Sequence, residues 1–340
     1  MIQKPNESRR RFLHTLGGAV IPFPALWIAK RSDGATGSPV GMGKSRVVAA
    51  RKEGLLQPST GIDLDGLGKL LDEAMRALSD KKDPIDAWRA LFSPGDHVAI
   101  KVNALGGRML SPHPELAYLI ADRLARAGVS PTRIAIWDRS ERELVKAGYE
   151  PARFKDKAVL TATDSRGIGY EAEPEISGSI GSCFSRIVSH GCTALINLGV
   201  LKDHDLSGVS VAMKNLFGVI HNPNKYHFDV HKDPYLPDLC LHPYIKNKLR
   251  LNICDGIRAQ YDGGPSYSPK GAWEYGGLLI STDPVALDSV GARIIDQKRI
   301  EQKLPSLRDK GREPVYLQLA EAKKAGIADP ARIEIQEVSG

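Results

Sequence analysis

Apolar side chains follow two different periods along residues 46–340. A short apolar run at 47–50 predicts a buried strand. Residues 64–78 instead repeat apolar side chains three and four positions apart, with polar residues between them. This spacing is typical of a helix that buries one face, so the chain begins its folded part with a strand and an amphipathic helix.

The next three segments form one supersecondary unit. Residues 97–103 read as a strand that runs into a glycine turn. A helix is predicted to start at Pro114 and to end at Gly128, because proline favours the first helical turn and glycine favours the end. Residues 133–138 then form the next apolar strand. Strand, helix and strand at this spacing make a βαβ unit, which implies parallel pairing.

The same reading extends to the rest of the chain and sets the fold class. We predict an α/β fold with a mostly parallel sheet, flanking helices and Rossmann-like βαβ units, in one large domain over 46–340. Residues 221–247 are polar, aromatic and interrupted by prolines, and predict a long inserted loop with a functional role. Further strands are predicted at 157–162, 193–198, 249–254 and 277–281, and further helices at 139–147, 283–296 and 315–325.

The first 31 residues have the layout of a targeting segment. The run from Ser8 to Leu13 resembles a twin-arginine export signal, with a polar residue, two arginines, one free position and Phe-Leu. An apolar, proline-containing stretch follows, and 32–45 reads as a Gly/Ser-rich linker. The alternative is a cytosolic basic arm before a buried helix. We predict export by the twin-arginine translocase to the periplasm, with cleavage near 29–35 or retention of the segment as an anchor.

The export segment also changes the meaning of the charge and of the cysteines. Residues 1–31 hold six Lys/Arg and one acid, a net +5, so the remainder carries only +2 of the total +7. Nucleic acid is therefore not an expected partner. The four cysteines contain no CxxC pair, which argues against a cysteine-ligated zinc or iron–sulfur site. In an oxidising periplasm either disulfides or free buried cysteines are possible.

Candidate chemistry concentrates between residues 197 and 262. His204 follows a predicted buried strand, and open α/β sheets bind ligands at the carboxyl ends of strands. Lys214 lies in an apolar run, where a lysine either reaches back to water or occupies a desolvated site with a lowered pKa. We predict His204 and Lys214 as catalytic residues. Substrate-binding residues are predicted at Lys101, Asn103, Asn215 and Asp262.

Five of the nine histidines lie between 204 and 242. Imidazole is a common metal ligand and titrates near neutral pH. We predict a metal site formed by His221, His227, His231 and Asp255, for a divalent ion such as nickel or iron. The alternative is a polar surface loop in which the histidines are incidental. Asp255 and Asp262 each precede a glycine and also fit ordinary Asp-Gly turns.

Several blocks, in this order along the chain, resemble the DUF362 family. They include Lys101-Val-Asn103, Leu201-Lys-Asp-His204, Lys214-Asn-Leu-Phe-Gly218 and Asp283-Pro-Val-Ala-Leu-Asp288, and they span about 97–296. The family is named for having no assigned function. Some members carry ferredoxin-type cysteine clusters, which this chain lacks.

The segment from His204 to Gly218 is also similar to nickel-pincer lactate racemases. In that family the lysine tethers a nickel-pincer nucleotide and the histidine is the acid/base, so the resemblance implies those roles for Lys214 and His204. Two functions follow as expectations. One is an exported metal- or cofactor-dependent enzyme that transfers a proton or hydride on a small polar metabolite. The other is a non-catalytic periplasmic protein that binds a small molecule or a metal.

Overall fold

The computed structural model describes residues 43–57, 61–230 and 232–340. Its centre is one large sheet in which β13 alone among the strands of the main path runs antiparallel to its neighbours. The α/β fold with a mostly parallel sheet is confirmed. In spatial order the main strands are β14 (Ile333–Ser339), β1 (Ser45–Arg51), β13 (Gly277–Ser281), β11 (Leu249–Gln260), β9 (Ala194–His204), β4 (Val98–Lys101), β5 (Ile134–Asp138) and β6 (Val159–Ala162).

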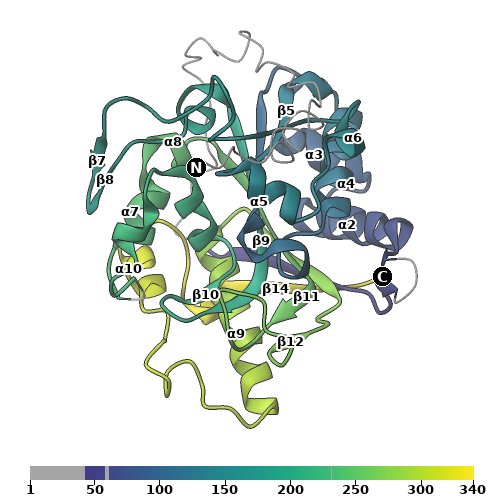
Figure 1. Cartoon of the computed structure of the whole chain (residues 1–340). Coiled ribbons are helices and arrows are strands. Elements are labelled where there is room, and N and C mark those ends of the chain that lie inside the picture. The colour runs from purple at the N-terminus through teal and green to yellow at the C-terminus, as the bar shows by residue number, and fades with distance from the viewer. Residues whose placement is uncertain (1–42, 58–60, 231) are drawn as a thin grey trace, which may run out of the picture.

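Helices cover both faces of this sheet (Figure 1). On one face α2 (Leu64–Ser79), α3 (Pro84–Leu91) and α4 (Pro114–Arg126) bury their apolar stripes in a core shared with β4 and β11. On the other face lie α7 (Tyr235–Leu241), α9 (Pro284–Glu301) and α10 (Tyr316–Ala322). The helices that the sequence predicts near 64–78, 114–128, 283–296 and 315–325 are confirmed in type and place.

The start of α9 shows why the local sequence specifies its element. Asp283 caps the helix and accepts hydrogen bonds from Val285 N and Ala286 N, and Pro284 occupies the first helical position. These interactions satisfy backbone donors that a helix start otherwise leaves without partners. The second Asp283 oxygen accepts from Ser45 Oγ and Ile327 N, so the cap also ties α9 to β1.

Two expectations need correction. Residues 221–247 are not one long irregular loop, because they contain η6 (Pro223–Tyr226), α7 and α8 (Pro243–Lys246). These elements bury Tyr226, Leu236 and Leu239 but are too short for a helical period to be visible in the sequence. The strands predicted at 193–198 and 249–254 both continue six residues further, into polar sequence. The strand β14 and the hairpin of β7 (Glu175–Ser177) and β8 (Ile180–Ser182) were not predicted.

The remaining elements are short connections. They are β2 (Leu56–Gln57), β3 (Gly61–Ile62), η2 (Ala104–Met109), η3 (Pro131–Arg133), α5 (Glu141–Lys146), α6 (Pro151–Phe154), η4 (Ile187–Gly191), β10 (Gly208–Ser210), η5 (Met213–Val219), β12 (Ala272–Trp273) and η7 (Pro330–Arg332). All four cysteines are free thiols. The export signal falls outside the described residues, as does most of the linker. No helix of the described ranges has both the length and the apolar character to cross a membrane.

Candidate active site

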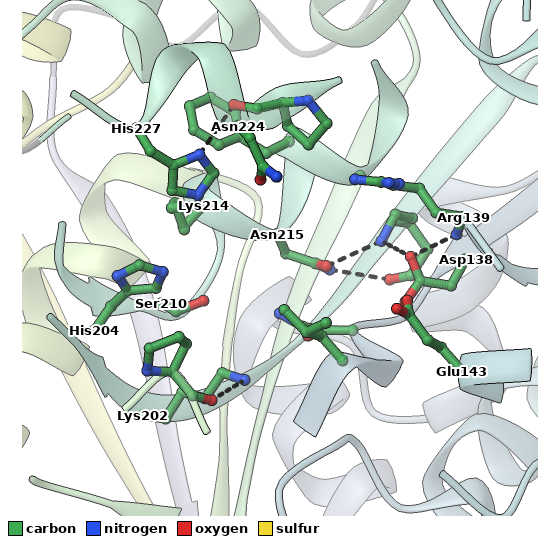
Figure 2. Close-up of a pocket in the computed structure, with 17 residues that line it drawn as sticks. Asp138, Arg139, Glu143, Lys202, His204, Ser210, Lys214, Asn215, Asn224 and His227 are labelled. Carbon is green, nitrogen blue, oxygen red and sulfur yellow. Dashed lines mark hydrogen bonds and ion pairs between the residues drawn. The ribbon is translucent and has the colours of Figure 1, made fainter. Parts of the chain in front are cut away.

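A cavity of about 300 Å³ opens at the carboxyl ends of three parallel strands, β4, β5 and β9. Seventeen residues line it, and ten of them come from the single stretch 202–227 (Figure 2). Its charged and polar wall includes Lys101, Asp138, Lys202, His204, Lys214, Asn215 and His227. Ligands of open α/β sheets bind at this edge, so the cavity lies where the fold predicts a site.

A hairpin and a short helix build the wall that carries Lys214. Gly208 turns the chain with φ +80°, and β10 folds back onto the end of β9 so that Gly208 pairs with His204. The helix η5 then begins beneath Asp288 of α9, whose carboxylate accepts from Ala212 N and Met213 N. Burial raises the pKa of Asp288 to about 7. Because these bonds fix the first turn, the position of Lys214 depends on the packing of α9.

Lys101 lies at the floor of the cavity, and protein atoms accept hydrogen bonds from all of its N–H groups. Its Nζ donates to Val102 O at 2.5 Å, to Asp138 Oδ1 at 2.6 Å and to Asn215 Oδ1 at 3.1 Å. An ammonium has three N–H groups, so all of them are used within the protein. Burial lowers the pKa of Lys101, and the Asp138 carboxylate opposes that effect. Gly218 provides the space, since a Cβ there would lie 2.6 Å from Lys101 Nζ.

A ladder of buried asparagines joins η5 to the sheet. Asn215 Nδ2 donates to Asn197 Oδ1 at 2.7 Å, and Asn197 Nδ2 donates to Asn252 Oδ1 at 3.0 Å. Asn252 Nδ2 continues the ladder to the carbonyls of Ser281, the last residue of β13, and Thr282. Buried amides are stable only when they are hydrogen-bonded, so this ladder fixes the register of η5 over β9 and β11. Asn215 therefore points its amide into the protein and holds the wall in place.

Lys214 and His227 form a hydrogen-bonded pair at the upper side of the cavity. Lys214 Nζ lies 2.8 Å from His227 Nε2, while His227 Nδ1 lies 3.0 Å from Pro223 O. The carbonyl can only accept, so Nδ1 carries the ring proton and Nε2 accepts from Lys214. Burial, followed by the charge of Lys202, lowers the pKa of Lys214 to about 7. Burial and Lys214 also lower the pKa of His227.

His204 faces the same cavity as a neutral imidazole. Burial, followed by the charges of Lys214 and other neighbours, lowers its pKa to about 2. His204 Nδ1 accepts from Leu206 N at 3.1 Å, which leaves the ring proton on Nε2. The Asp205 carboxylate lies 3.0 Å from Nδ1, but with a neutral ring this contact is not an ion pair. The ring centres of His204 and His227 are 6.1 Å apart.

Lys202 is a cavity residue that the sequence reasoning missed. Its side chain is 1% exposed, and its Nζ donates one hydrogen bond, to Pro265 O at 3.3 Å. Burial lowers its pKa to about 8. The signal was present, because Lys202 stands two positions before His204 and shares its side of the strand. Arg139, Ser210 and Asn224 also line the cavity without having been predicted.

The predicted metal ligands are not brought together. His221 is exposed and packs its ring edge-on against Tyr170. Asp255 is buried and accepts from His113, with 2.8 Å between Oδ2 and Nδ1. His227 pairs with Lys214, and His231 lies outside the described residues. Within the part of the chain that the structure describes, no three His, Cys, Asp or Glu side chains form a group that would hold a metal ion.

The predicted substrate-binding residues divide in the same way. Asn103 lines the cavity, together with Lys101 and Asn215. Asp262 does not line it, because its carboxylate accepts from the buried guanidinium of Arg299 at 2.7 Å. The structure thus gathers one set of predicted residues around the cavity and places Asp262, His221 and Asp255 elsewhere. The gathered residues are His204, Lys214, His227, Lys101, Asn103 and Asn215.

Comparison with known proteins agrees with the blocks noted in the sequence. A family model described as "Domain of unknown function (DUF362)" matches residues 98–293, which is more than half of the chain and includes every residue that lines the cavity. The chain is also 26% identical over 220 residues to the thylakoid-associated protein sll1697 of Synechocystis sp.. That match covers 61% of this chain and 65% of the relative, so the chain spans just under two thirds of the relative's length.

Proposed function

The chain belongs to the DUF362 family, and we propose that its cavity is the active site of an enzyme that transfers a proton on a small polar metabolite. One observation carries this proposal. The buried Lys214 has a neutral imidazole as its hydrogen-bond partner, at 2.8 Å, and a pKa of about 7. A lysine that exchanges its proton near neutral pH is suited to general acid/base catalysis, whereas one paired to a carboxylate stays charged.

Lys214, His204 and Lys202 have different roles in the proposed proton transfer. The neutral amine of Lys214 takes the proton from a carbon next to a carbonyl or carboxylate group, and the electron pair of the broken C–H bond moves onto the oxygen of that group. His204 donates its Nε2–H toward that oxygen, because a neutral imidazole is a hydrogen-bond donor that does not give up its proton. The Lys202 charge adds electrostatic stabilisation. Return of the proton from Lys214 completes the reaction, so no other reactant is consumed.

This division differs from the nickel-pincer scheme that the sequence suggested. The scheme needs a histidine ligand for nickel as well as a lysine tether. His227 Nε2 already accepts from Lys214, and neither His221 nor Asp255 reaches the cavity. Among the described residues, moreover, no three His, Cys, Asp or Glu side chains form a group that would hold a metal ion, so the proposed roles use protein groups alone. His204 and Lys214 keep their proposed catalytic roles without it.

Hydrogen exchange in D2O tests the proposal, and it works even where the product is unidentified. The purified protein is incubated with a panel of 2-hydroxy and 2-oxo acids, and proton NMR records the loss of the C–H signal. We expect exchange with at least one compound. Lys214→Ala and His204→Ala should slow it at least about 100-fold with little change in thermal melting. The control Lys298→Ala, outside the cavity, should keep the rate. Unfolding of both cavity variants would assign these residues a structural role.

A non-catalytic binding protein is the second candidate, and the same cavity supports it. A ligand at a hundredfold excess over its Kd should then stabilise the fold by about 3 kcal/mol. Stabilisation by a compound that shows no exchange and no product in the NMR assay favours this candidate over the enzyme.

Export remains part of the proposal, on the basis of the Arg9-Arg10 motif. Cell fractionation should find the protein in the periplasm or on its membrane. Replacement of Arg9 and Arg10 by lysine should retain it in the cytoplasm. Equal distribution of the wild type and this variant refutes the use of the twin-arginine translocase.

A further inference from the structure

Three buried lysines face the same cavity, but their hydrogen bonding differs. Lys101, Lys202 and Lys214 are 1%, 1% and 8% exposed, and all three line the cavity. Lys101 uses all three of its N–H groups on oxygen atoms of the protein. Lys202 donates one hydrogen bond, to Pro265 O, and Lys214 has one, to His227. Lys214 Nζ also lies 4.4 Å from the centre of the Phe217 ring, a cation–π contact. Among the described residues, two N–H groups of each of these two ammonium groups thus have no oxygen or nitrogen acceptor in the protein.

The carboxylates nearest in sequence do not neutralise these charges. Asp203 is fully buried, but its oxygens accept from Gly264 N at 2.8 Å and from Arg312 at 3.3 Å. The Asp205 side chain is 59% exposed and lies against His204. Asp138 is taken by Lys101. The charges of Lys202 and Lys214 also repel each other, and after burial the charge of Lys202 is the next cause of the lowered pKa of Lys214.

Burial of a charged group without a partner is costly, and proteins tolerate it where a ligand completes the site. We propose that Lys202 binds an oxyanion group of the ligand, a carboxylate or a phosphate, and anchors it in the cavity beside Lys214. This inference rests on the proposed function in that it names the substrate class of the same cavity. Binding does not require that Lys214 also transfer a proton.

The anchor role separates Lys202 from a lysine that merely supports the fold. The oxyanion supplies acceptors for N–H groups that the protein leaves open, and it screens the two lysines from each other. Without the ligand, Lys202 is a buried charge that the charge of Lys214 repels, so removal of Lys202 should leave the stability of the ligand-free protein unchanged or raise it. A lysine that holds the loop at Pro265 would behave in the opposite way, because its removal would loosen that loop.

The experiment measures affinity and melting temperature on the same variants. Oxalate and inorganic phosphate are titrated calorimetrically into the full chain in a chloride buffer, which separates a carboxylate from a phosphate preference. Lys202→Met should weaken the binding of the preferred anion about 10- to 100-fold, the loss expected for a charge-assisted hydrogen bond. Its melting temperature without anion should stay equal or rise. Lys298→Met removes an equal charge on the far part of α9 and should change neither quantity.

Three results overturn the inference. The first is that the wild type binds neither anion with a Kd below about 10 mM. The second is that Lys202→Met binds the anion with an affinity within about twofold of the wild type. The third is that Lys202→Met melts at a lower temperature, which would show a structural role. Lys202→Arg keeps the charge and should retain most of the binding. Anion binding without hydrogen exchange supports this inference and refutes the proposed catalysis. Hydrogen exchange that persists unchanged in Lys202→Met supports the proposed catalysis and refutes the role of Lys202 as the anchor.

Discussion

The ion pair between Lys101 and Asp138 offers the sharpest test of how the cavity floor is held. Asp138 accepts three hydrogen bonds: from Lys101 Nζ at 2.6 Å, from Ala104 N at 2.7 Å and from Arg139 N at 2.8 Å. These donors reach both carboxylate oxygens. In Asp138→Asn the amide has one accepting oxygen, so its NH2 group faces a donor whichever way it turns. The substitution also leaves the buried ammonium of Lys101 without its counter-charge.

The magnitude follows from these two losses. Removal of one partner of a buried ion pair costs about 3–5 kcal/mol, a large share of the roughly 5–15 kcal/mol that stabilises a typical domain. Urea unfolding of Asp138→Asn should therefore show that loss. The double variant Lys101→Met/Asp138→Asn should lose about 2 kcal/mol less than the sum of the single variants, because it leaves no unpaired charge. Glu301→Gln breaks the surface pair with Lys298 and should cost less than about 1 kcal/mol. A loss below about 1 kcal/mol for Asp138→Asn contradicts the reasoning.

Three further predictions concern the same site and its surroundings. Gly218→Ala places a Cβ 2.5 Å from Lys101 Cε and should destabilise the protein by about 1–3 kcal/mol in urea unfolding, whereas Gly181→Ala, whose Cβ would meet its nearest neighbour at 3.7 Å, should be nearly neutral. If Lys214 is the base, exchange in D2O should rise with pH through about 7 and then level, because its neutral form is the active one. A flat profile would point to His204 instead, whose pKa of about 2 keeps it neutral throughout. Burial disfavours the charged form of His113, but the Asp255 carboxylate outweighs burial and raises the His113 pKa, so the stability from this pair is present below about pH 6.5 and is lost as pH rises through the raised value. The difference in unfolding free energy between wild type and His113→Gln should therefore shrink as the pH rises above about 6.5, and a constant gap would be inconsistent with an ionised pair.

Much of the fold could be predicted from the sequence because local sequence preferences and tertiary packing favour the same elements. The helices α2, α4 and α9 carry complete apolar stripes or clear end signals, and the strands near the sheet centre are continuous apolar runs. The polar extensions of β9 and β11 could not be predicted from the sequence, because their side chains form hydrogen bonds with residues that are distant in the sequence. Asp255, for instance, meets His113 across 142 positions. Spacing along the sequence holds no information about such a pair.

The site was predicted in part for a similar reason. His204 and Lys214, predicted as catalytic, and His227, predicted as a metal ligand, lie around one cavity because one short stretch of chain carries all three. His221 is only six residues from His227, yet Asn222 adopts φ 50° and Pro223 starts a new helical turn, so the two rings diverge. Lys101 and Lys202 show the limit most clearly. Both are buried lysines, and only the count of their hydrogen bonds distinguishes Lys101, which holds the floor, from Lys202, for which we propose an anion ligand.

The concentration of the cavity wall in residues 202–227 has a consequence for how the cavity tolerates change. The sheet, with Lys101 and Asp138 at its edge, provides a floor that is bonded internally. The opposite wall begins within β9 itself, because Lys202 and His204 are strand residues that pair with β10, and it continues through the hairpin into η5. Substitutions at these two strand positions therefore act on the cavity and on strand pairing together. A transplant of this stretch into another protein of the family would have to include the end of β9.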